Sequence, residues 1–103
     1  MIEPQRTPAA GVLKVSAHSN PNSVAGALAG VLREKPAAEL QAIGAGATNQ
    51  AVKAIAIARS YLRASEIDIV CVPEFTDVEI DGNVRTAIRL LVERRPVPPE
   101  KTD

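Results

Sequence analysis

Aromatic residues and cysteine are almost missing from this chain of 103 residues, which contains one Phe, one Tyr, no Trp and one Cys. A single cysteine cannot form an internal disulfide, and the opening residues MIEPQRTP lack the pattern of a signal peptide, so we do not expect secretion. No stretch approaches the roughly 20 apolar residues of a membrane-spanning helix. We therefore expect a cytoplasmic protein without a membrane role, whose core is built from Ala, Val, Ile and Leu.

The charged residues show no excess of either sign, because 12 Lys and Arg balance 12 Asp and Glu. The chain as a whole is therefore not attracted to nucleic acid or to anionic lipid. His18 is the only histidine, which excludes a metal site built from several imidazoles, and Cys71 lies among valines, where a core position is expected. Serines that neighbour a histidine in sequence rarely form a nucleophile–base geometry. We expect a non-enzymatic protein that needs no cofactor and no metal.

Proline marks the two ends of the chain. Five of the eight prolines fall within the first eight or the last eight residues, which also lack apolar periodicity: Pro4, Pro8, Pro96, Pro98 and Pro99. Such segments bury too little apolar surface to offset their ordering entropy. The pattern predicts a folded domain over 12–95, between an N-terminal tail at 1–11 and a C-terminal tail at 96–103.

The first part of the domain predicts a strand followed by a helix. VLKVSA at 12–17 alternates as a strand does. Asn20 is a good N-cap and Pro21 suits the first helical position, so we expect a helix that ends before Pro36. Glycines inside a helix cost about 1 kcal/mol each relative to Ala, so a neighbouring element or a partner should approach the small residues of this helix closely. These residues are Ala25, Gly26, Ala29 and Gly30.

The middle of the domain predicts a short strand at 39–43 and a long helix over 49–64 that Thr48 caps. One apolar face of this helix continues the core, and Ile57 and Tyr61 belong to a second one. A helix with two apolar faces has more surface to bury than one sheet can cover. We therefore hypothesise a homodimer that uses Ile57 and Tyr61.

A hairpin completes the domain. IDIVCVPEFTDVEI at 67–80 predicts a strand in which Pro73 requires a sheet edge or a bulge, because it has no ladder donor. A turn at 81–83 leads to a strand at 84–93. We expect a three-residue loop, since it pairs Ile80 with Val84 and sets Glu79 opposite Arg85.

Three carboxylates alternate along the predicted hairpin and therefore share one face: Asp77, Glu79 and Asp81. Oxygen ligands at alternate positions could suggest a cation site. We interpret them instead as a solvated face that is partly paired with Arg85.

The resulting order, β-α-β-α-β-β, predicts an α/β fold: a two-layer α/β sandwich with both helices on one face of a mixed four-stranded sheet. The loops at 17–20 and 44–47 then emerge at the same edge, each in front of a helix N-terminus. Free N–H groups at such a position can bind phosphate or carboxylate. The same loops are also explained as simple turns, capped by Asn20 and Thr48.

Three long segments carry a resemblance to a known family: LKVSAHSNPNSVAGALAGVLRE, AIGAGATNQAVKAIAIARSYL and VPEFTDVEIDGNVRTAI. In this order they resemble the bacterial stage V sporulation protein S family, over about residues 12–94. That family is similar in fold to the Alba chromatin proteins. The resemblance implies a small Alba-like homodimer that is associated with nucleic acid and acts in the regulation of sporulation or development.

The Alba-like binding surface, carried over by position, comprises Lys14, His18, Ser19, Asn20, Asn22, Gly44, Gly46, Asn49, Gln50, Lys53 and Arg85. Unlike the basic arm of Alba proteins, the hairpin here is acidic, and acidic residues oppose contact with phosphate. With so few aromatic residues, stacking on bases is not expected. The resemblance therefore implies weak contacts with the nucleic-acid backbone that are indifferent to sequence. The alternative is a module that binds a protein or a small anion through the same loops, without a nucleic-acid role.

Overall fold

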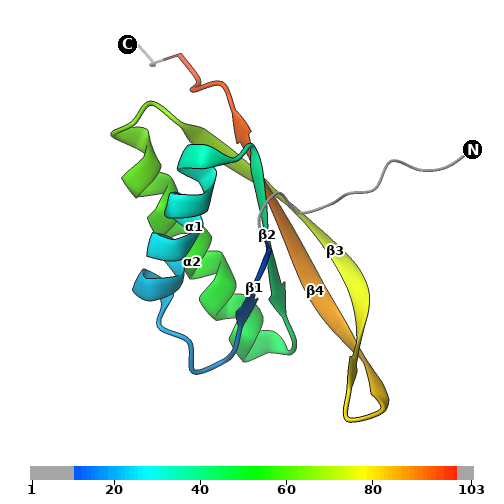
Figure 1. The fold of residues 1–103 in the computed structure, drawn as a ribbon. Coiled ribbons are helices and arrows are strands. Elements are labelled where there is room, and N and C mark those ends of the chain that lie inside the picture. Colours follow the sequence, from blue (N-terminus) through cyan, green and yellow to red (C-terminus); the bar gives the residue numbers. More distant parts are fainter. Residues whose placement is uncertain (1–10, 100–103) are drawn as a thin grey trace, which may run out of the picture.

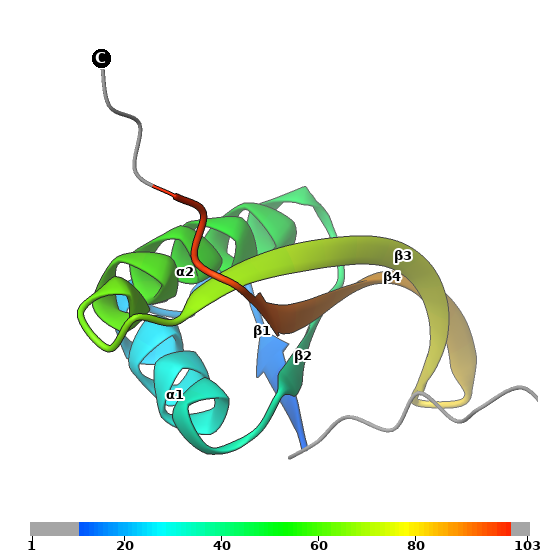
Figure 2. The same ribbon diagram turned by 90° about the horizontal axis from the view of Figure 1, so that it is seen from above.

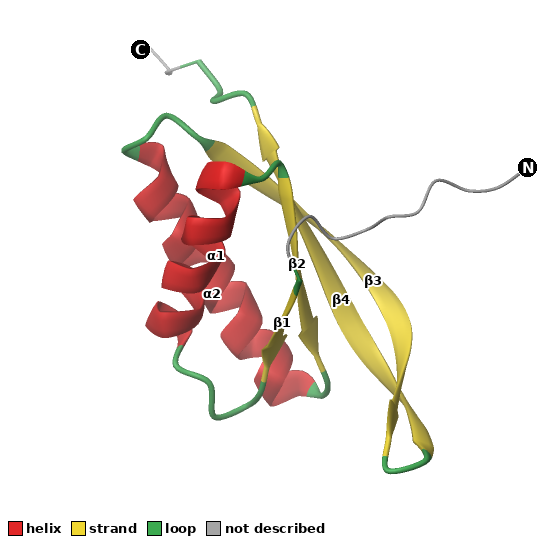
Figure 3. Cartoon of the chain, viewed as in Figure 1, coloured by secondary structure: helices red, strands yellow, loops and turns green. Residues whose placement is uncertain are grey.

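Two helices lie on one face of a four-stranded sheet in the computed structural model, which describes residues 11–99 (Figures 1 and 3). The elements follow one another as β1 (Val12–Val15), α1 (Pro21–Glu34), β2 (Ala37–Ala42), α2 (Ala45–Arg63), β3 (Asp68–Ile80) and β4 (Asn83–Arg95). The predicted two-layer α/β fold is thereby confirmed. The predicted tails at 1–11 and 96–103 lie partly outside the described residues.

The sheet is mixed, as predicted, with the strand order β1-β2-β4-β3. β1 is parallel to β2, whereas β4 is antiparallel to both β2 and β3. β3 is thus an edge strand, and its register with β4 continues without a bulge through Pro73, which lies opposite Leu90. The edge position predicted for Pro73 is correct, and proline at an edge hinders pairing with a further strand.

The core lies between the helices and the sheet and is aliphatic, as the composition requires. The largest fully buried apolar side chains are Leu28, Leu32, Leu40, Leu62 and Val92. α2 buries four alanines and Leu62 along one face, and α1 buries Ala25 and Ala29 beside its leucines. Such small side chains let the two helices and the sheet approach closely.

The glycines of α1 do not take part in this contact. Gly26 and Gly30 are exposed, and a Cβ built on either one meets no atom of the described residues within 4 Å. Within this chain, the expectation of a neighbouring element against these two glycines is therefore wrong. The buried small residues of the stripe are the alanines instead.

α2 begins at Ala45, four residues before the predicted start. Gly44 precedes it with φ of 91°, a conformation that favours glycine. Thr48 is not the cap: it lies in the first turn, and its hydroxyl donates to the Gly44 carbonyl at 2.8 Å. The helix starts early because Ala47 already belongs to its buried face, which outweighs the poor helix propensity of Gly46.

The hairpin turn has two residues rather than the predicted three. Ile80 pairs with Asn83, and Asp81 and Gly82 both have positive φ, at 52° and 79°. An Asp-Gly pair suits this geometry, which matches the twist of the flanking strands, and that preference outweighs cross-strand charge pairing. Arg85 therefore lies opposite Val78 and on the other face from Asp77 and Glu79, so the predicted pairing with these carboxylates is wrong.

The outer half of this hairpin extends beyond the rest of the sheet. β2 pairs with β4 only as far as Ile88, which lies opposite Phe75, and the hairpin continues beyond this pair as a two-stranded arm. Seen from above, the arm curves away from the helices (Figure 2). We call residues 75–87 the hairpin arm.

A buried carboxylate joins α2 to the two long strands. The Asp68 side chain is fully buried, and it accepts hydrogen bonds from Arg59 Nε at 2.6 Å and from Arg95 Nε at 2.8 Å. The bond from Arg59 in particular holds the pKa of the Asp68 carboxyl well below its usual range, although burial alone acts in the opposite direction. The two guanidinium groups thus compensate a charge that would otherwise be costly to bury.

We predict that Asp68→Asn lowers the free energy of unfolding at pH 7 by about 2 kcal/mol, because it removes the charge from two hydrogen bonds. A carboxyl whose pKa is depressed in the folded state stabilises the fold above its ordinary pKa of about 4, and this stabilisation is lost as the pH falls below that value. Urea unfolding between pH 7 and pH 2 should therefore show that the difference in unfolding free energy between the wild type and Asp68→Asn becomes smaller in acid. Glu93→Gln, at an exposed carboxyl, serves as the control, and a difference that is independent of pH would contradict the assignment.

Candidate functional site

The loops in front of the two helices lie side by side, as the sequence predicts (Figure 1). Gln50 reaches across from α2 and donates to the Ser19 carbonyl at 2.8 Å. Gly46 comes so close to the first loop that a Cβ added to it would lie 3.0 Å from Ala17 Cβ. We call residues 16–22 and 44–50 together the paired-loop surface.

The first loop satisfies its own backbone. Ser19 Oγ accepts from the Ser16 amide at 2.9 Å, and Ser16 Oγ accepts from the His18 amide at 3.1 Å. Asn20 caps α1, as predicted, because its Oδ1 accepts from the amides of Asn22 at 2.8 Å and Ser23 at 3.2 Å. The serine and asparagine oxygens therefore fix the shape of this loop, and His18 is exposed on it.

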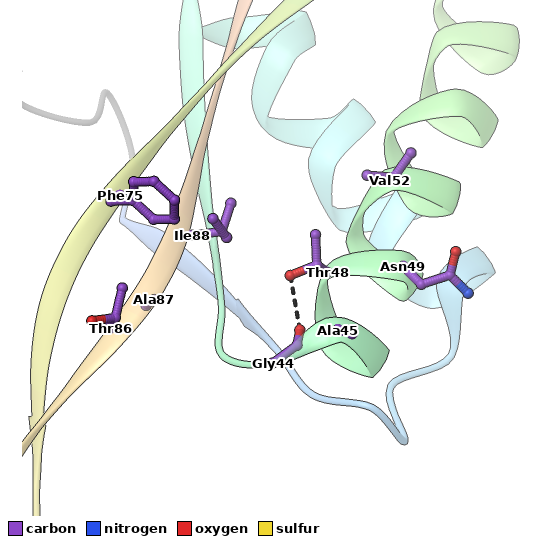
Figure 4. Close-up of a pocket in the computed structure, with 9 residues that line it drawn as sticks. All are labelled: Gly44, Ala45, Thr48, Asn49, Val52, Phe75, Thr86, Ala87 and Ile88. Atoms are coloured by element: carbon purple, nitrogen blue, oxygen red, sulfur yellow. Dashed lines mark hydrogen bonds between the residues drawn. The ribbon is translucent and has the colours of Figure 1, made fainter.

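The second loop leaves its helix start open. The N-cap residue, Gly44, has no side chain that could accept from the first amides of α2, and Thr48 turns its hydroxyl to the Gly44 carbonyl instead (Figure 4). The amides of the first helical turn are donors without a helical partner, and the helix dipole adds positive potential there. This end of α2 can accept an anion, and Asn49 lies exposed beside it.

The basic residues assigned to this site separate into two places. Lys53 is exposed on α2, one turn after Asn49, and so extends the paired-loop surface. Lys14 lies on the sheet face away from the helices, because Val15 beside it is buried toward the core. Arg85 lies on the hairpin arm, opposite Val78. The structure thus brings the loop residues together with Lys53, but it places Lys14 and Arg85 on the other side of the sheet.

Acidic residues are nearly absent from the helical layer, whereas the sheet carries charges of both signs. From Ser16 to Arg33 and from Ile43 to Ser65, the two loops and almost all of both helices contain no Asp or Glu. They carry Arg33, Lys53, Arg59 and Arg63 together with His18. The hairpin arm, by contrast, contains three carboxylates and a single basic residue. The zero net charge of the chain therefore hides a basic helical layer.

A family model described as stage V sporulation protein S matches residues 11–95. The chain belongs to the stage V sporulation protein S family. The match runs through every helix and strand described above, and it makes this a sporulation-related protein.

In this stage V sporulation protein S family member, the open face of the sheet is not basic. Arg89 lies between two carboxylates: it forms an ion pair with Glu74 and a longer contact with Glu39, with Nε 3.9 Å from Oε2. Burial raises the pKa of the Glu39 carboxyl, and the charge of Arg89 acts in the opposite direction. Lys14 shares a cavity of roughly 300 Å³ with Gln41 and with Val78 and Ile80 of the arm.

The sequence also singled out Cys71 and the carboxylates of the hairpin. Cys71 is half-buried against the core, and burial raises the pKa of its thiol. Within residues 11–99, no three His, Cys, Asp or Glu side chains gather as a metal site would need, and neither helix is long and apolar enough to cross a membrane.

The residues predicted for a dimer interface occupy different environments. Ile57 is half-buried and packs against the core of its own chain, whereas Tyr61 is exposed. Among residues 11–99, the most exposed large apolar side chain is that of Phe75, on the hairpin arm, with 78% of its surface accessible. Sequence reasoning missed it, although its alternation with Asp77 and Glu79 places it on the solvated face of that strand.

We predict that three glycine substitutions separate the paired-loop contact from ordinary helix propensity. Gly26→Ala and Gly30→Ala should each raise the free energy of unfolding by up to about 1 kcal/mol, because both sites are open. Gly46→Ala should give no such gain, since its Cβ would meet Ala17. Urea unfolding measures the three differences, and amide shifts around Ala17 report the displaced loop. An equal gain at Gly46, with unmoved Ala17 resonances, would contradict the close contact.

Proposed function

We propose that this protein is a non-enzymatic regulator of sporulation that binds the phosphate backbone of nucleic acid as a homodimer. In this proposal the contact is made by the paired-loop surface and Lys53. The observation that carries it is the absence of acidic residues from Ser16 to Arg33 and from Ile43 to Ser65, which leaves the loops and the helical layer basic. The open N-terminus of α2 faces outward from the same surface.

The chemistry of this surface favours the backbone over the bases. Lysine and free helix amides bind phosphate by charge and by hydrogen bonds, and neither reads a base sequence. The hairpin arm carries Asp77, Glu79 and Asp81, which repel phosphate, so we expect the arm to point away from the bound nucleic acid. Stacking on bases is not expected either, because Phe75 lies on this acidic arm.

The non-enzymatic part of the proposal rests on the surroundings of His18. The hydroxyls nearest to it in sequence, those of Ser16 and Ser19, lie within 3.3 Å of each other, and each accepts from a backbone amide. A serine nucleophile needs a histidine that is itself held in position by a third group. The serine hydroxyls here accept hydrogen bonds that stabilise the turn, and His18 is exposed on that turn.

We predict a graded dependence on salt. Fluorescence anisotropy of a labelled 20-base-pair DNA duplex, titrated between 20 and 200 mM NaCl, should show affinity falling steeply with salt, because counterions are released from the phosphates. Lys53→Gln should reduce the slope of log K against log salt by about 1 for each protomer that contacts the duplex. Lys35→Gln, exposed at the other end of the helical layer, is the matched control and should leave the slope unchanged.

Two outcomes oppose this proposal in different ways. No binding at 20 mM NaCl by the folded protein would contradict a nucleic-acid role. If inorganic phosphate then shifted the amides of residues 45–47, the small-anion alternative would stand. If Lys53→Gln and Lys35→Gln bind with equal salt-dependence slopes, the protein binds nucleic acid, but through a surface other than the one proposed.

A further inference from the structure

A strip of exposed residues runs along α2 and β3, and its chemical character changes in order from one end to the other. At the tip side it is acidic, in the middle it is apolar, and at the far end it is basic. We call it the α2–β3 strip, and it consists of Glu79, Asp77, Phe75, Val52, Arg59 and Arg63.

The middle of the strip is an apolar notch between α2 and the hairpin arm (Figure 4). Its volume is roughly 530 Å³. Val52, Phe75 and Ile88 contribute to its walls, and at one end it reaches the start of α2, where Gly44, Ala45, Thr48 and Asn49 line it. Val52 is 52% exposed, and Phe75 is more exposed still. An exposed Phe beside an apolar hollow is typical of an interaction surface, because covering it with a partner removes apolar area from water.

The acidic end follows from the register of the arm. Thr86 and Ile88 both line the notch, and they lie opposite Asp77 and Phe75. Side chains two residues apart in a strand share a face, so Phe75, Asp77 and Glu79 continue one face toward the tip. With a rise of about 3.3 Å per residue, the two carboxylates lie roughly 7 and 13 Å beyond Phe75.

The basic end follows from the periodicity of α2. Arg59 and Arg63 lie seven and eleven residues after Val52 and therefore on the same side of the helix. At about 1.5 Å per residue they lie roughly 10 and 16 Å beyond Val52. Because Arg59 bonds to Asp68, the first residue of β3, α2 runs antiparallel to that strand, and the arginines lie away from the tip.

We propose that the α2–β3 strip is the homodimer interface, with a two-fold axis passing near Phe75 and Val52. A two-fold rotation about this point places the acidic end of each copy against the basic end of the other, so the same charged contact forms twice. The spacings on the two sides of the apolar centre are similar, which such self-complementarity requires. The Asp68 bond also holds Arg59 in place, so this guanidinium needs little ordering on association.

A second copy fits this surface better than other occupants do. Nucleic acid would be repelled by Asp77 and Glu79, and an acidic partner would match only the arginine half. The inference specifies the dimer of the proposed function, and it places the interface on the side of α2 that faces β3 rather than at Ile57 and Tyr61. Ile57 already packs within its own chain.

Sedimentation velocity between 1 and 200 µM in 50 mM NaCl tests the proposal without nucleic acid. The wild-type chain should dimerise. Glu79→Arg and Arg63→Glu should each weaken dimerisation at least tenfold, because each places like charges across the interface twice. The double variant carries both reversals in both copies and should recover most of the affinity. Phe75→Ser should abolish the dimer, whereas Val72→Ser, on the other face of the same strand, should leave it intact.

Circular dichroism confirms that each variant is folded, so a loss of dimer is not a loss of structure. A wild-type monomer at 200 µM would overturn the proposal, and so would a dimer that survives Phe75→Ser or a double variant no better than its parents. Anisotropy with the DNA duplex is measured separately on the same variants. If DNA binding depends on Lys53 but dimerisation is unaffected by the strip variants, the nucleic-acid proposal stands and the proposed interface is wrong.

Discussion

The alanine face of α2 fixes the position of this helix, and the rest of the structure depends on that position. Four alanines and Leu62 are buried along it, so the helix lies close against α1 and the sheet. Its N-terminus is thereby brought against the first loop, where Gly46 leaves room for Ala17. Its C-terminal half is held by the bond from Arg59 to Asp68. Both proposed surfaces depend on this position: one lies at the start of the helix, and the other continues from there along the side that faces β3.

The distribution of acidic residues suits the two proposed surfaces to different partners. The chain has no net charge, yet its acidic residues avoid the loops and nearly all of the helical layer and gather in part on the hairpin arm. A basic layer with an open helix N-terminus favours phosphate. A strip with opposite charges at its two ends favours a copy of itself. In the proposed dimer the acidic arm contacts the second copy rather than the nucleic acid, which would account for a hairpin that repels a duplex.

Much of the fold could be predicted because local signals agree with the tertiary arrangement. Asn20 and Pro21 begin α1 where their cap chemistry requires, and Pro73 indicates an edge strand. The errors arise where two local preferences compete. Gly44 and Gly46 suggest a break in the chain, but the buried position of Ala47 starts α2 early. In the turn, the backbone preference of Asp81 and Gly82 prevails over charge pairing.

The candidate site was only partly predictable, because sequence gives a list of residues and not the face on which each one lies. Once the end of β1 is known, the alternation of side chains along the strand places Lys14 on the sheet face away from the helices, apart from the loop that follows. The one-residue difference in the turn moves Arg85 to the other face. Asp68 could have been noticed as a carboxylate within the apolar run IDIV, which requires a cationic partner when buried. Its partners, Arg59 and Arg95, come from separate elements and are visible only in the structure.

The central claim is that the paired-loop surface binds phosphate, and a ¹⁵N–¹H correlation spectrum recorded during titration with a short DNA duplex tests it most directly. The account predicts that the amides of Ala45, Gly46 and Ala47 shift together with that of Lys53, and that added salt reverses the shifts. The amides from Asp77 to Arg85 should stay in place. Shifts confined to the hairpin arm or to the open face around Lys14 and Arg89 would contradict the account.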